Sequence, residues 1–229
     1  MLNNYKIICL IPAKKKSTQL KNKNLLKIKG ISLVERAIKS SLYCKYIDHT
    51  FLSSDSKKIL NFKKKYDITS IVRPKKLSTK KSLADDVIFH AIKIIKKKLE
   101  GYIDIVCIYL QPTSPFRNYK HIDQALRFFF KNNTKSLVSV EENHKSIYKT
   151  VFIKNHRIFP FFKETYINSN RQFFPKTYSP NGAIYIFKIK DFLKKNTIPI
   201  KNSVPYLMSK KDSLDIDDSF DLKIAQLLA

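Results

Sequence analysis

Long apolar runs are missing from this sequence, and the longest stretches, such as residues 103–110 with Asp104 inside, have only the length of a strand. A helix that crosses a bilayer needs about 20 predominantly apolar residues, so we expect neither a membrane span nor a membrane partner. The N-terminal residues MLNNYKIICLIPA also lack the layout of a secretion signal, and their short apolar run suits a first strand better. We therefore expect a protein of the cytoplasm.

Cysteine is scarce, and its spacing suits neither a metal site nor a set of disulfides. The three cysteines, Cys9, Cys44 and Cys107, are far apart in the chain, and an odd number of thiols cannot all pair. Cys9 and Cys107 also lie inside apolar, strand-like runs. We expect three reduced thiols that are mostly buried.

Acidic residues are few, 18 against 45 lysines and arginines, and the formal net charge is +27. One interpretation is affinity for polyanions such as nucleic acid. The other is coding bias, because the chain is rich in Lys, Asn, Ile and Phe and has three glycines, as AT-rich coding would produce. The lysines are dispersed over nearly every expected helix rather than gathered in one tract. This dispersal favours bias, and we expect no specific nucleic-acid partner.

Strand and helix patterns alternate along most of the chain. Hydrophobic residues make up 43% of the 229 positions, which is ample for the core of one α/β domain over residues 1–229. Strand patterns occupy residues 5–11, 50–53, 68–72, 103–110, 136–140 and 183–187, and helical patterns occupy residues 33–42, 56–66, 84–99, 119–132 and 218–229. Ser82, with Asp85 three residues on, is the expected N-cap of the helix at 84–99. The alternation predicts a doubly wound, mostly parallel sheet.

The alternation stops at residues 141–180. This stretch contains extended, aromatic-rich pieces at residues 148–153 and 159–162. It predicts a β-rich excursion from the main sheet and is a candidate dimerisation arm, because exposed apolar patches usually mark interfaces. The alternative is that its aromatic residues pack beneath the main sheet, as most aromatic residues do.

The first polar loop follows the first expected strand directly. It reads IPAKKKS at residues 11–17, and Lys23 and Asn24 come shortly after it. In open α/β sheets, ligands bind at the carboxyl ends of the strands. Lys14, Ser17 and Lys23 could hold a triphosphate there by charge and hydrogen bonds. In so lysine-rich a chain, composition by itself favours the alternative, a solvated lysine loop.

A second polar loop, QPTSP at residues 111–115, follows the strand expected at 103–110. Its two prolines make the turn rigid, and its three polar side chains stand at the carboxyl end of that strand. An ordinary proline-bounded turn is the alternative, but the position favours a ligand site.

Asp215 and Asp217 are separated by one residue. If the backbone is extended there, both carboxylates point the same way, and oxygen ligands at this spacing suit Mg²⁺ that bridges substrate phosphates. Equally, Asp217 or Asp218 could cap the last helix, with Asp221 in its first turn. From the residues alone the two interpretations are even.

Arg171, between Asn170 and Gln172, is the fourth candidate site residue. A guanidinium among polar and aromatic residues suits a substrate carboxylate. The alternative is a surface arginine.

Read in order, these segments resemble the CMP-sialic acid synthetase family of cytidylyltransferases. That family opens with I-P-A-R-G-G-S-K-x-x-x-x-K-N, which stands here as IPAKKKST at residues 11–18 with Lys23 and Asn24 in register. Later matches are QPTSPFR at 111–117, NRQ at 170–172, NGAIY at 181–185 and SLDID at 213–217, with shorter ones at Gly30, Ser53–Asp55 and Arg73–Pro74. The resemblance covers nearly the whole chain.

The resemblance implies a Rossmann-like fold with a β-rich dimerisation excursion, a homodimer, Mg²⁺ as cofactor, and transfer of CMP from CTP to N-acetylneuraminate or legionaminate. The anomeric hydroxyl of the acidic sugar would attack the α-phosphate, and pyrophosphate would leave. The residues implied to bind the nucleotide are Ala13, Lys14, Ser17, Lys23, Asn24, Arg73 and Ser82. Of these, Lys14, Ser17, Lys23 and Asn24 would hold the phosphates, and Arg73 and the loop through Ser82 would lie against cytidine.

The resemblance also implies how the second substrate and the metal are held. Gln111 and Arg171, with Lys149 and Gln172, would hold the acidic sugar. Asp215 and Asp217 would bind Mg²⁺, and Lys23 and Asp217 would be catalytic.

Four departures from the family motifs bear on activity. Lys14 replaces the family arginine, which keeps the charge but loses the bidentate fork. Lys15 and Lys16 replace two glycines, and if their backbones need positive φ, each costs on the order of 1 kcal/mol or more. Lys80 stands where the family usually has Asp. The alternatives are therefore CMP transfer to another acid, KDO or pseudaminate, or a weakened relative that only binds nucleotide or RNA.

Overall fold

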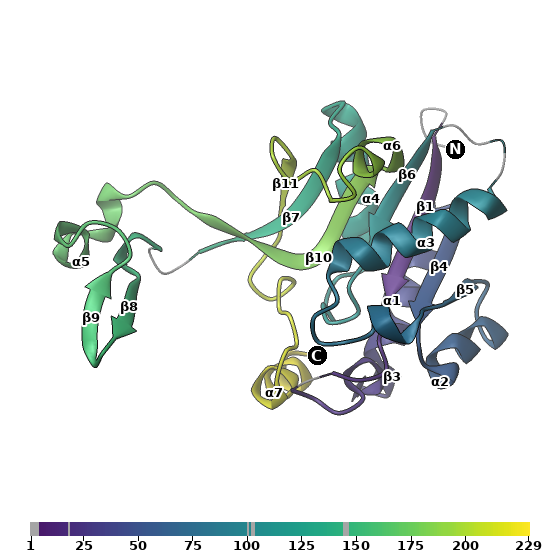
Figure 1. Cartoon of the computed structure of the whole chain (residues 1–229), viewed down its shortest axis with the longest axis horizontal. Coiled ribbons are helices and arrows are strands. Elements are labelled where there is room, and N and C mark those ends of the chain that lie inside the picture. The colour runs from purple at the N-terminus through teal and green to yellow at the C-terminus, as the bar shows by residue number, and fades with distance from the viewer. Residues whose placement is uncertain (1–4, 18, 100, 102–103, 144–146) are drawn as a thin grey trace.

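A seven-stranded sheet lies at the centre of the structure, in the order β11–β7–β10–β6–β1–β4–β5 (Figure 1). The structure is a computed structural model, and it describes residues 5–17, 19–99, 101, 104–143 and 147–229. The strands of this sheet are β1 (Lys6–Pro12), β4 (His49–Ser54), β5 (Thr69–Val72), β6 (Ile105–Tyr109), β7 (Ser136–Glu142), β10 (Tyr178–Lys188) and β11 (Val204–Leu207). A strand is found at each of the six predicted places, with bounds that differ by a few residues. Ile103, the predicted start of β6, lies outside the described residues.

The sheet is mostly parallel, as predicted. β1 runs parallel to both β4 and β6, β4 runs parallel to β5, and β11 runs parallel to β7. The exception is β10, which is antiparallel to β6 on one side and to β7 on the other. β10 carries the chain back from the excursion after β7, and this return explains its direction.

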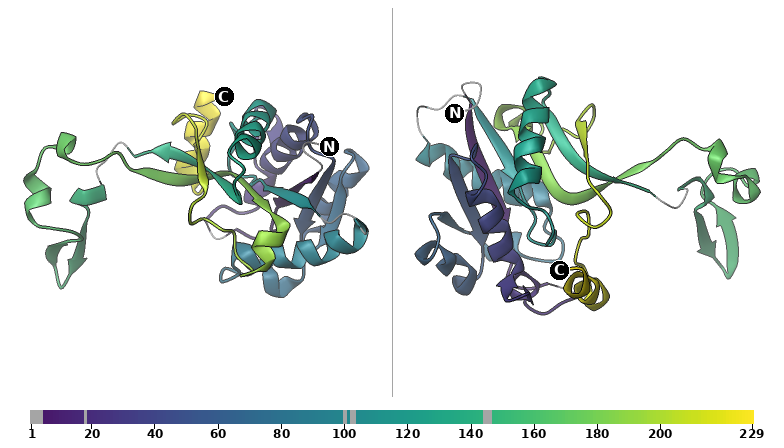
Figure 2. Two further views of the ribbon diagram at one scale, coloured as in Figure 1. Left: turned by 90° about the horizontal axis from the view of Figure 1, so that it is seen from above. Right: turned by 180° about the vertical axis from the view of Figure 1, so that it is seen from behind.

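Helices lie on both faces of the sheet (Figure 2). Those that pack on it are α1 (Leu33–Leu42), α2 (Lys57–Leu60), α3 (Ala84–Lys98), α4 (Tyr119–Lys131) and α6 (Ile189–Leu193), whereas α5 (Thr165–Asn168) and α7 (Ser219–Leu228) lie away from its faces. Alternate residues of β1 enter the two layers: Ile7 and Cys9 pack with α1, α2 and α4, while Ile8 and Leu10 pack with α3 and α6. The three cysteines are free and buried, as predicted.

Two local predictions need correction. Ser82 is not the N-cap of α3; that position is Leu83, and no side chain caps it. The Ser82 hydroxyl instead accepts from the Thr79 amide and donates to the Lys76 carbonyl. Asp85, expected to complete the cap, accepts from Thr197 and Ile198, which lie after α6.

The second correction concerns the helix predicted at residues 56–66. It is divided into α2 and a 3₁₀ turn, Asn61–Lys64. Within the described residues, no helix combines the length and the apolar character that a membrane crossing requires.

The predicted excursion projects away from the sheet as an arm (Figures 1 and 2). It leaves the end of β7, forms the hairpin of β8 (Val151–Lys154) and β9 (Arg157–Pro160), and returns through α5 to β10. Its aromatic rings contact one another, as in the stacked pairs Tyr148–Phe174 and Phe152–Phe159. These rings do not pack beneath the main sheet, so the alternative to an arm is wrong. Several remain exposed: Phe152, Phe159, Phe161, Phe162 and Phe173.

Candidate active site

A cleft of ≈ 320 Å³ opens at the carboxyl ends of β1, β5 and β6. It is bounded by the end of β1 at Pro12, by Arg73 just after β5, and by the end of β6 at Tyr109. Parallel strands bring these ends to one edge of the sheet, where open α/β sheets bind ligands. Nine predicted site residues line this cleft together: Lys14, Ser17, Lys23, Asn24, Arg73, Ser82, Gln111, Asp215 and Asp217.

The loop after β1 is held by hydrogen bonds to β4. The Ala13 amide donates to the Ser53 carbonyl at 2.9 Å, and the Ser54 hydroxyl donates to the Ala13 carbonyl at 2.6 Å. Asn24 Nδ2 donates to the Lys14 carbonyl at 2.9 Å. Ala13 is fully buried and fixes the loop from beneath, while Lys14 lines the cleft.

Lys15 and Lys16 carry no backbone strain of the kind expected. Seven described residues other than glycine have positive φ, and neither lysine is among them. The Lys15 amide donates to Asp55 Oδ1 at 2.7 Å, so the loop is anchored through its backbone. The penalty of positive φ therefore does not apply at these two positions.

Arg73 supplies a buried cation to the cleft. Its Nε donates to Ser53 Oγ at 3.2 Å, and its Nη2 donates to the Ser53 carbonyl at 2.7 Å. Burial lowers the pKa of Arg73, while Tyr109 and Asp55 act in the opposite direction. Among the described residues, no carboxylate forms an ion pair with Arg73, so its charge is available to an anionic ligand.

Asp215 and Asp217 are held against the second predicted loop. The amide of the intervening Ile216 donates to the Thr113 carbonyl at 2.9 Å, and the Ile216 side chain is fully buried beneath. Lys23 Nζ donates to the Ile216 carbonyl at 2.7 Å and to Asp217 Oδ1 at 2.9 Å. The cap of the last helix is Asp218, with Asp221 completing a capping box, so both carboxylates of Asp215 and Asp217 are left to the cleft.

The donor set fits a divalent cation that also binds substrate phosphates. Asp215 Oδ1 is buried and has no hydrogen-bond partner. Burial raises the pKa of Asp215, and the charge of Asp217 adds to this, while Thr113 and Lys23 oppose it. Within the described part of the chain, no three His, Cys, Asp or Glu side chains converge as a metal cage. Mg²⁺ is commonly held by only one or two carboxylates together with phosphates and water, and Asp215 and Asp217 meet that requirement.

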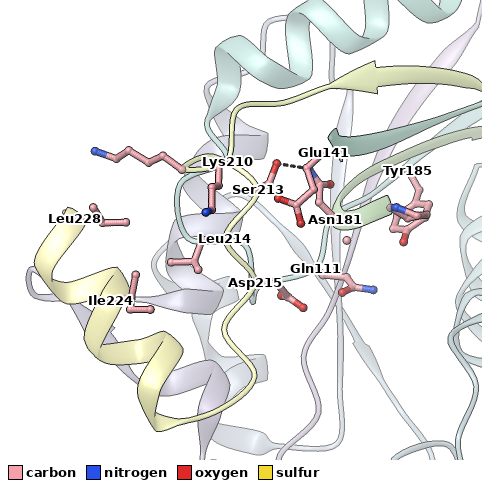
Figure 3. A pocket seen from close by; sticks show the side chains of 13 residues that line it. Gln111, Glu141, Asn181, Tyr185, Lys210, Ser213, Leu214, Asp215, Ile224 and Leu228 are labelled. Carbon is pink, nitrogen blue, oxygen red and sulfur yellow. Dashed lines mark hydrogen bonds between the residues drawn. The ribbon is translucent and has the colours of Figure 1, made fainter. Parts of the chain in front are cut away.

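A second, larger cavity of ≈ 770 Å³ adjoins the cleft (Figure 3). Gln111 and Asp215 line both spaces and therefore stand at the junction between them. The other residues that line the cavity are Glu141, Pro180, Asn181, Gly182, Tyr185, Lys210, Lys211, Ser213, Leu214, Ile224 and Leu228. The site can thus hold two ligands that meet at one point.

Gln111 is positioned by a close backbone approach. Gly182 has φ +74°, which favours glycine, and a Cβ placed there would lie 3.0 Å from Gln111 Oε1, so a side chain would press on Gln111. On the other side of Gln111, buried Arg117 donates to the carbonyls of Gln111 and Ala183 at 3.0 and 3.1 Å. Burial lowers the pKa of Arg117 to about 10. These contacts tie the second loop to β10.

The structure does not bring the arm residues to this site. Lys149 lies in the 3₁₀ turn Ile147–Lys149 of the arm. Arg171 and Gln172 line a separate cavity of ≈ 600 Å³ on the arm, and Arg171 Nη2 donates to the Asn143 carbonyl at 3.4 Å. The predicted sugar-binding set is therefore split within one chain: Gln111 is at the cavity, and the other three are on the arm.

Six polar residues of the larger cavity were not identified as site residues; two of them, Asn181 and Ser213, lie within the NGAIY and SLDID motifs. Tyr185 lies within the NGAIY motif, so the motif itself could have identified it. Glu141, Lys210 and Lys211 stand in no motif, and they reach the cavity only because β7 and the segment before α7 fold against it. Local sequence carries no signal for such a long-range meeting.

Comparison with known proteins places this geometry among nucleotide-transferring enzymes. A family model described as Cytidylyltransferase matches residues 8–207. The N-acylneuraminate cytidylyltransferase of Escherichia coli O18:K1:H7 is 31% identical over 222 residues, which are 96% of this chain and 51% of that protein. This chain thus spans about half the length of that relative.

Two other relatives match over nearly their full length. The pseudaminic acid cytidylyltransferase of Campylobacter jejuni serotype O:2 is 28% identical over 224 residues, covering 97% of this chain and 96% of the relative. The CMP-N,N'-diacetyllegionaminic acid synthase of Legionella pneumophila is 29% identical over 232 residues, with coverage of 97% and 96%.

Solved structures share the fold at much lower identity. A CMP:2-keto-3-deoxy-manno-octonic acid synthetase complexed with CTP has a TM-score of 0.68 and 13% identity, covering 97% of this chain and 98% of that one. A 4-diphosphocytidyl-2C-methyl-D-erythritol synthase has a TM-score of 0.73 and 9% identity, with coverage of 98% of each chain. These likenesses confirm the predicted Rossmann-like fold.

Proposed function

This chain belongs to the cytidylyltransferase family, and on that basis we propose that it couples CTP to a nine-carbon acidic sugar of the sialic type, such as N-acetylneuraminate or legionaminate. The products are the CMP-sugar and pyrophosphate. The observation that carries the proposal is the junction of the two spaces at Gln111 and Asp215. CTP occupies the cleft, the acidic sugar occupies the larger cavity, and the reacting atoms meet between them.

The cleft residues bind and orient the nucleotide. Lys14, Ser17, Lys23 and Asn24 hold the triphosphate by charge and hydrogen bonds, and buried Ala13 keeps their loop in place. Arg73 and Ser82, on the other side of the cleft, lie against cytidine.

The reaction is an in-line displacement, and positioning and charge neutralisation account for most of the catalysis. The anomeric hydroxyl gives its proton to water or to the carboxylate pair of Asp215 and Asp217 as its oxygen forms a bond to the α-phosphorus, and the bond from that phosphorus to the bridging oxygen of pyrophosphate breaks. Lys23 neutralises developing charge on the phosphates, and Asp217 holds its ammonium in place.

Asp215 and Asp217 are the residues that would hold Mg²⁺. When bound, the ion neutralises phosphate charge and orients the triphosphate. The unpartnered Asp215 Oδ1 supports this assignment.

The arm residues enter the proposal through a homodimer. Lys149, Arg171 and Gln172 lie on an arm that projects from the body (Figure 2). In a pair of chains such an arm reaches the partner's sugar cavity, where a guanidinium meets the carboxylate of the acid. We place this homodimer in the cytoplasm, where its proposed substrate CTP is found.

Pyrophosphate release from CTP tests the proposal directly. The purified chain is incubated with CTP, Mg²⁺ and one acid at a time: N-acetylneuraminate, legionaminate, pseudaminate or KDO. Mass spectrometry then identifies the CMP-sugar. We expect turnover with the nine-carbon acids, little with KDO, and none when UTP or ATP replaces CTP. Release no faster than the sugar-free blank with every acid would refute the proposal and leave only nucleotide binding.

A further inference from the structure

Helix α7 has two separate apolar faces. Leu222 and Ala225 pack into a small core with Ile28 and Leu33. Ile224 and Leu228 share a second face of the helix, because side chains four positions apart lie one above the other. Both of them line the larger cavity. Ile224 and Leu228 are therefore not needed to pack the helix against its core, and they face the space assigned to the acidic sugar.

The cavity has unlike walls (Figure 3). Leu214, Ile224 and Leu228 lie on one side, with Lys210 beside Leu214, and Glu141, Asn181 and Tyr185 lie on the other side. Leu228 is 43% exposed, which leaves apolar surface in contact with water. An occupant that covers it with apolar groups gains binding free energy, whereas hydroxyl groups placed there lose hydrogen bonds to water.

We infer that the wall of Leu214, Ile224 and Leu228 receives apolar substituents of the sugar, so that the site prefers nine-carbon acids with two acylamino groups and a terminal methyl over N-acetylneuraminate. N-acetylneuraminate carries one acylamino group and a hydroxylated tail, so it offers this wall fewer methyl groups. The inference rests on the proposed function and narrows its substrate class. The wall adjoins the junction residue Asp215, and this continuity favours the sugar over a second protein as its occupant.

The test compares two substrates in wall variants of the full chain. The readout is kcat/KM for N,N'-diacetyllegionaminate divided by kcat/KM for N-acetylneuraminate, measured by pyrophosphate release. Ile224→Gln and Leu228→Gln keep a good helix former at each position. We expect each to lower the ratio roughly tenfold, as the loss of one apolar contact does in a specificity pocket. Ile224→Met, which keeps the wall apolar, retains the ratio.

Leu227→Gln is the matched control, because Leu227 is on the same helix, is 86% exposed and does not line the cavity. It should leave the ratio unchanged. Turnover with an unaltered ratio in both glutamine wall variants would overturn the inference and leave the proposed function standing. A glutamine variant that keeps the ratio but sediments at half the mass would assign the wall to a second copy instead. Absence of turnover with every acid in the unmutated chain would overturn the proposed function itself.

Discussion

The ammonium of Lys23 donates to the carboxylate of Asp217 at 2.9 Å, although 194 positions separate the two residues in the chain. The Asp217 side chain is 64% exposed, so the pair contributes at most about 1 kcal/mol to stability. Both residues line the cleft, which points to catalysis instead. The two residues should therefore separate activity from stability when they are mutated.

Asp217→Asn and Lys23→Met should each lower kcat by at least about 10²-fold. Lys23→Met removes the ammonium that neutralises phosphate charge, and Asp217→Asn removes the carboxylate that holds this ammonium and would bind Mg²⁺. Both variants should unfold within about 1 kcal/mol of the unmutated chain. Pyrophosphate release measures the first effect, and urea unfolding measures the second. Unchanged turnover and unchanged Mg²⁺ dependence in Asp217→Asn would remove Asp217 from the site.

The neighbouring Asp218 is the matched control for Asp217. Its side chain accepts from the amides of Phe220 and Asp221 at 2.8 and 3.0 Å and caps α7. Asp218→Ala should cost about 1 kcal/mol of stability and keep turnover. The two adjacent carboxylates should thus show opposite patterns.

The strands of this fold could be predicted because burial and side-chain alternation both appear in the local sequence. Ile8 and Leu10 of β1 enter one helical layer, while Ile7 and Cys9 enter the other, so a continuous apolar run was the expected signature. The capping pair predicted at Ser82 and Asp85 failed because the Ser82 hydroxyl bonds to Thr79 and Lys76, and Asp85 accepts from Thr197 and Ile198. Tertiary contacts of that range outweigh a local capping pattern.

The cleft and the larger cavity of the candidate site also differed in how far their residues could be predicted from local sequence. Residues just after β1, β5 and β6 could be assigned together, since parallel strands end at one edge of the sheet. Glu141 and Lys210 could not be assigned, because only the folded path of β7 and the segment before α7 brings them to the cavity. Asp218 rather than Asp217 caps the last helix, with Asp221 in its first turn, and the Mg²⁺ assignment of Asp217 stays a prediction.

Gly182 should be intolerant of any side chain. Gly182→Ala imposes φ +74° on an L-residue, at about 1–2 kcal/mol, and places Cβ 3.0 Å from Gln111 Oε1. The displaced Gln111 should raise KM for the acidic sugar more than KM for CTP. Gly30→Ala is the control: φ there is +77°, but nothing lies within 4 Å of the added Cβ. If both variants change the two KM values alike, Gln111 is not a sugar ligand.

The +27 charge should give only weak, salt-sensitive binding to nucleic acid. Dispersed lysines release counterions from any polyanion, so the apparent affinity should fall steeply with salt and should not depend on sequence. Fluorescence anisotropy with several labelled RNA and DNA oligonucleotides at two salt concentrations measures this. Tight, sequence-selective RNA binding at physiological salt would favour the alternative of a binding protein.

The arm should hold two chains together. It exposes apolar side chains such as Ile153 at 75% and Phe173 at 77%, and exposed apolar patches of this kind usually mark interfaces. Where the arm leaves the body, the Asn143 amide donates to the Thr177 carbonyl at 2.9 Å and joins its two chain segments. Sedimentation should report about twice the chain mass of 26.8 kDa. A fully active monomer at micromolar concentration would contradict the proposed role of the arm.

Mixing two inactive variants should restore activity if the arm serves the partner's site. Asp217→Asn disables the cleft of its own chain, and Arg171→Ala removes a cation from the arm that the chain extends to its partner's site. In a mixed dimer, one site carries both defects, and the other combines an intact Asp217 with an intact Arg171. Unfolding and refolding the two variants together should therefore recover pyrophosphate release well above the sum of the separate variants. The control is the double variant refolded with Arg171→Ala, in which every site lacks the arginine and no activity should return. Recovery in neither mixture, with dimers confirmed by sedimentation, would place Arg171 outside the sugar site.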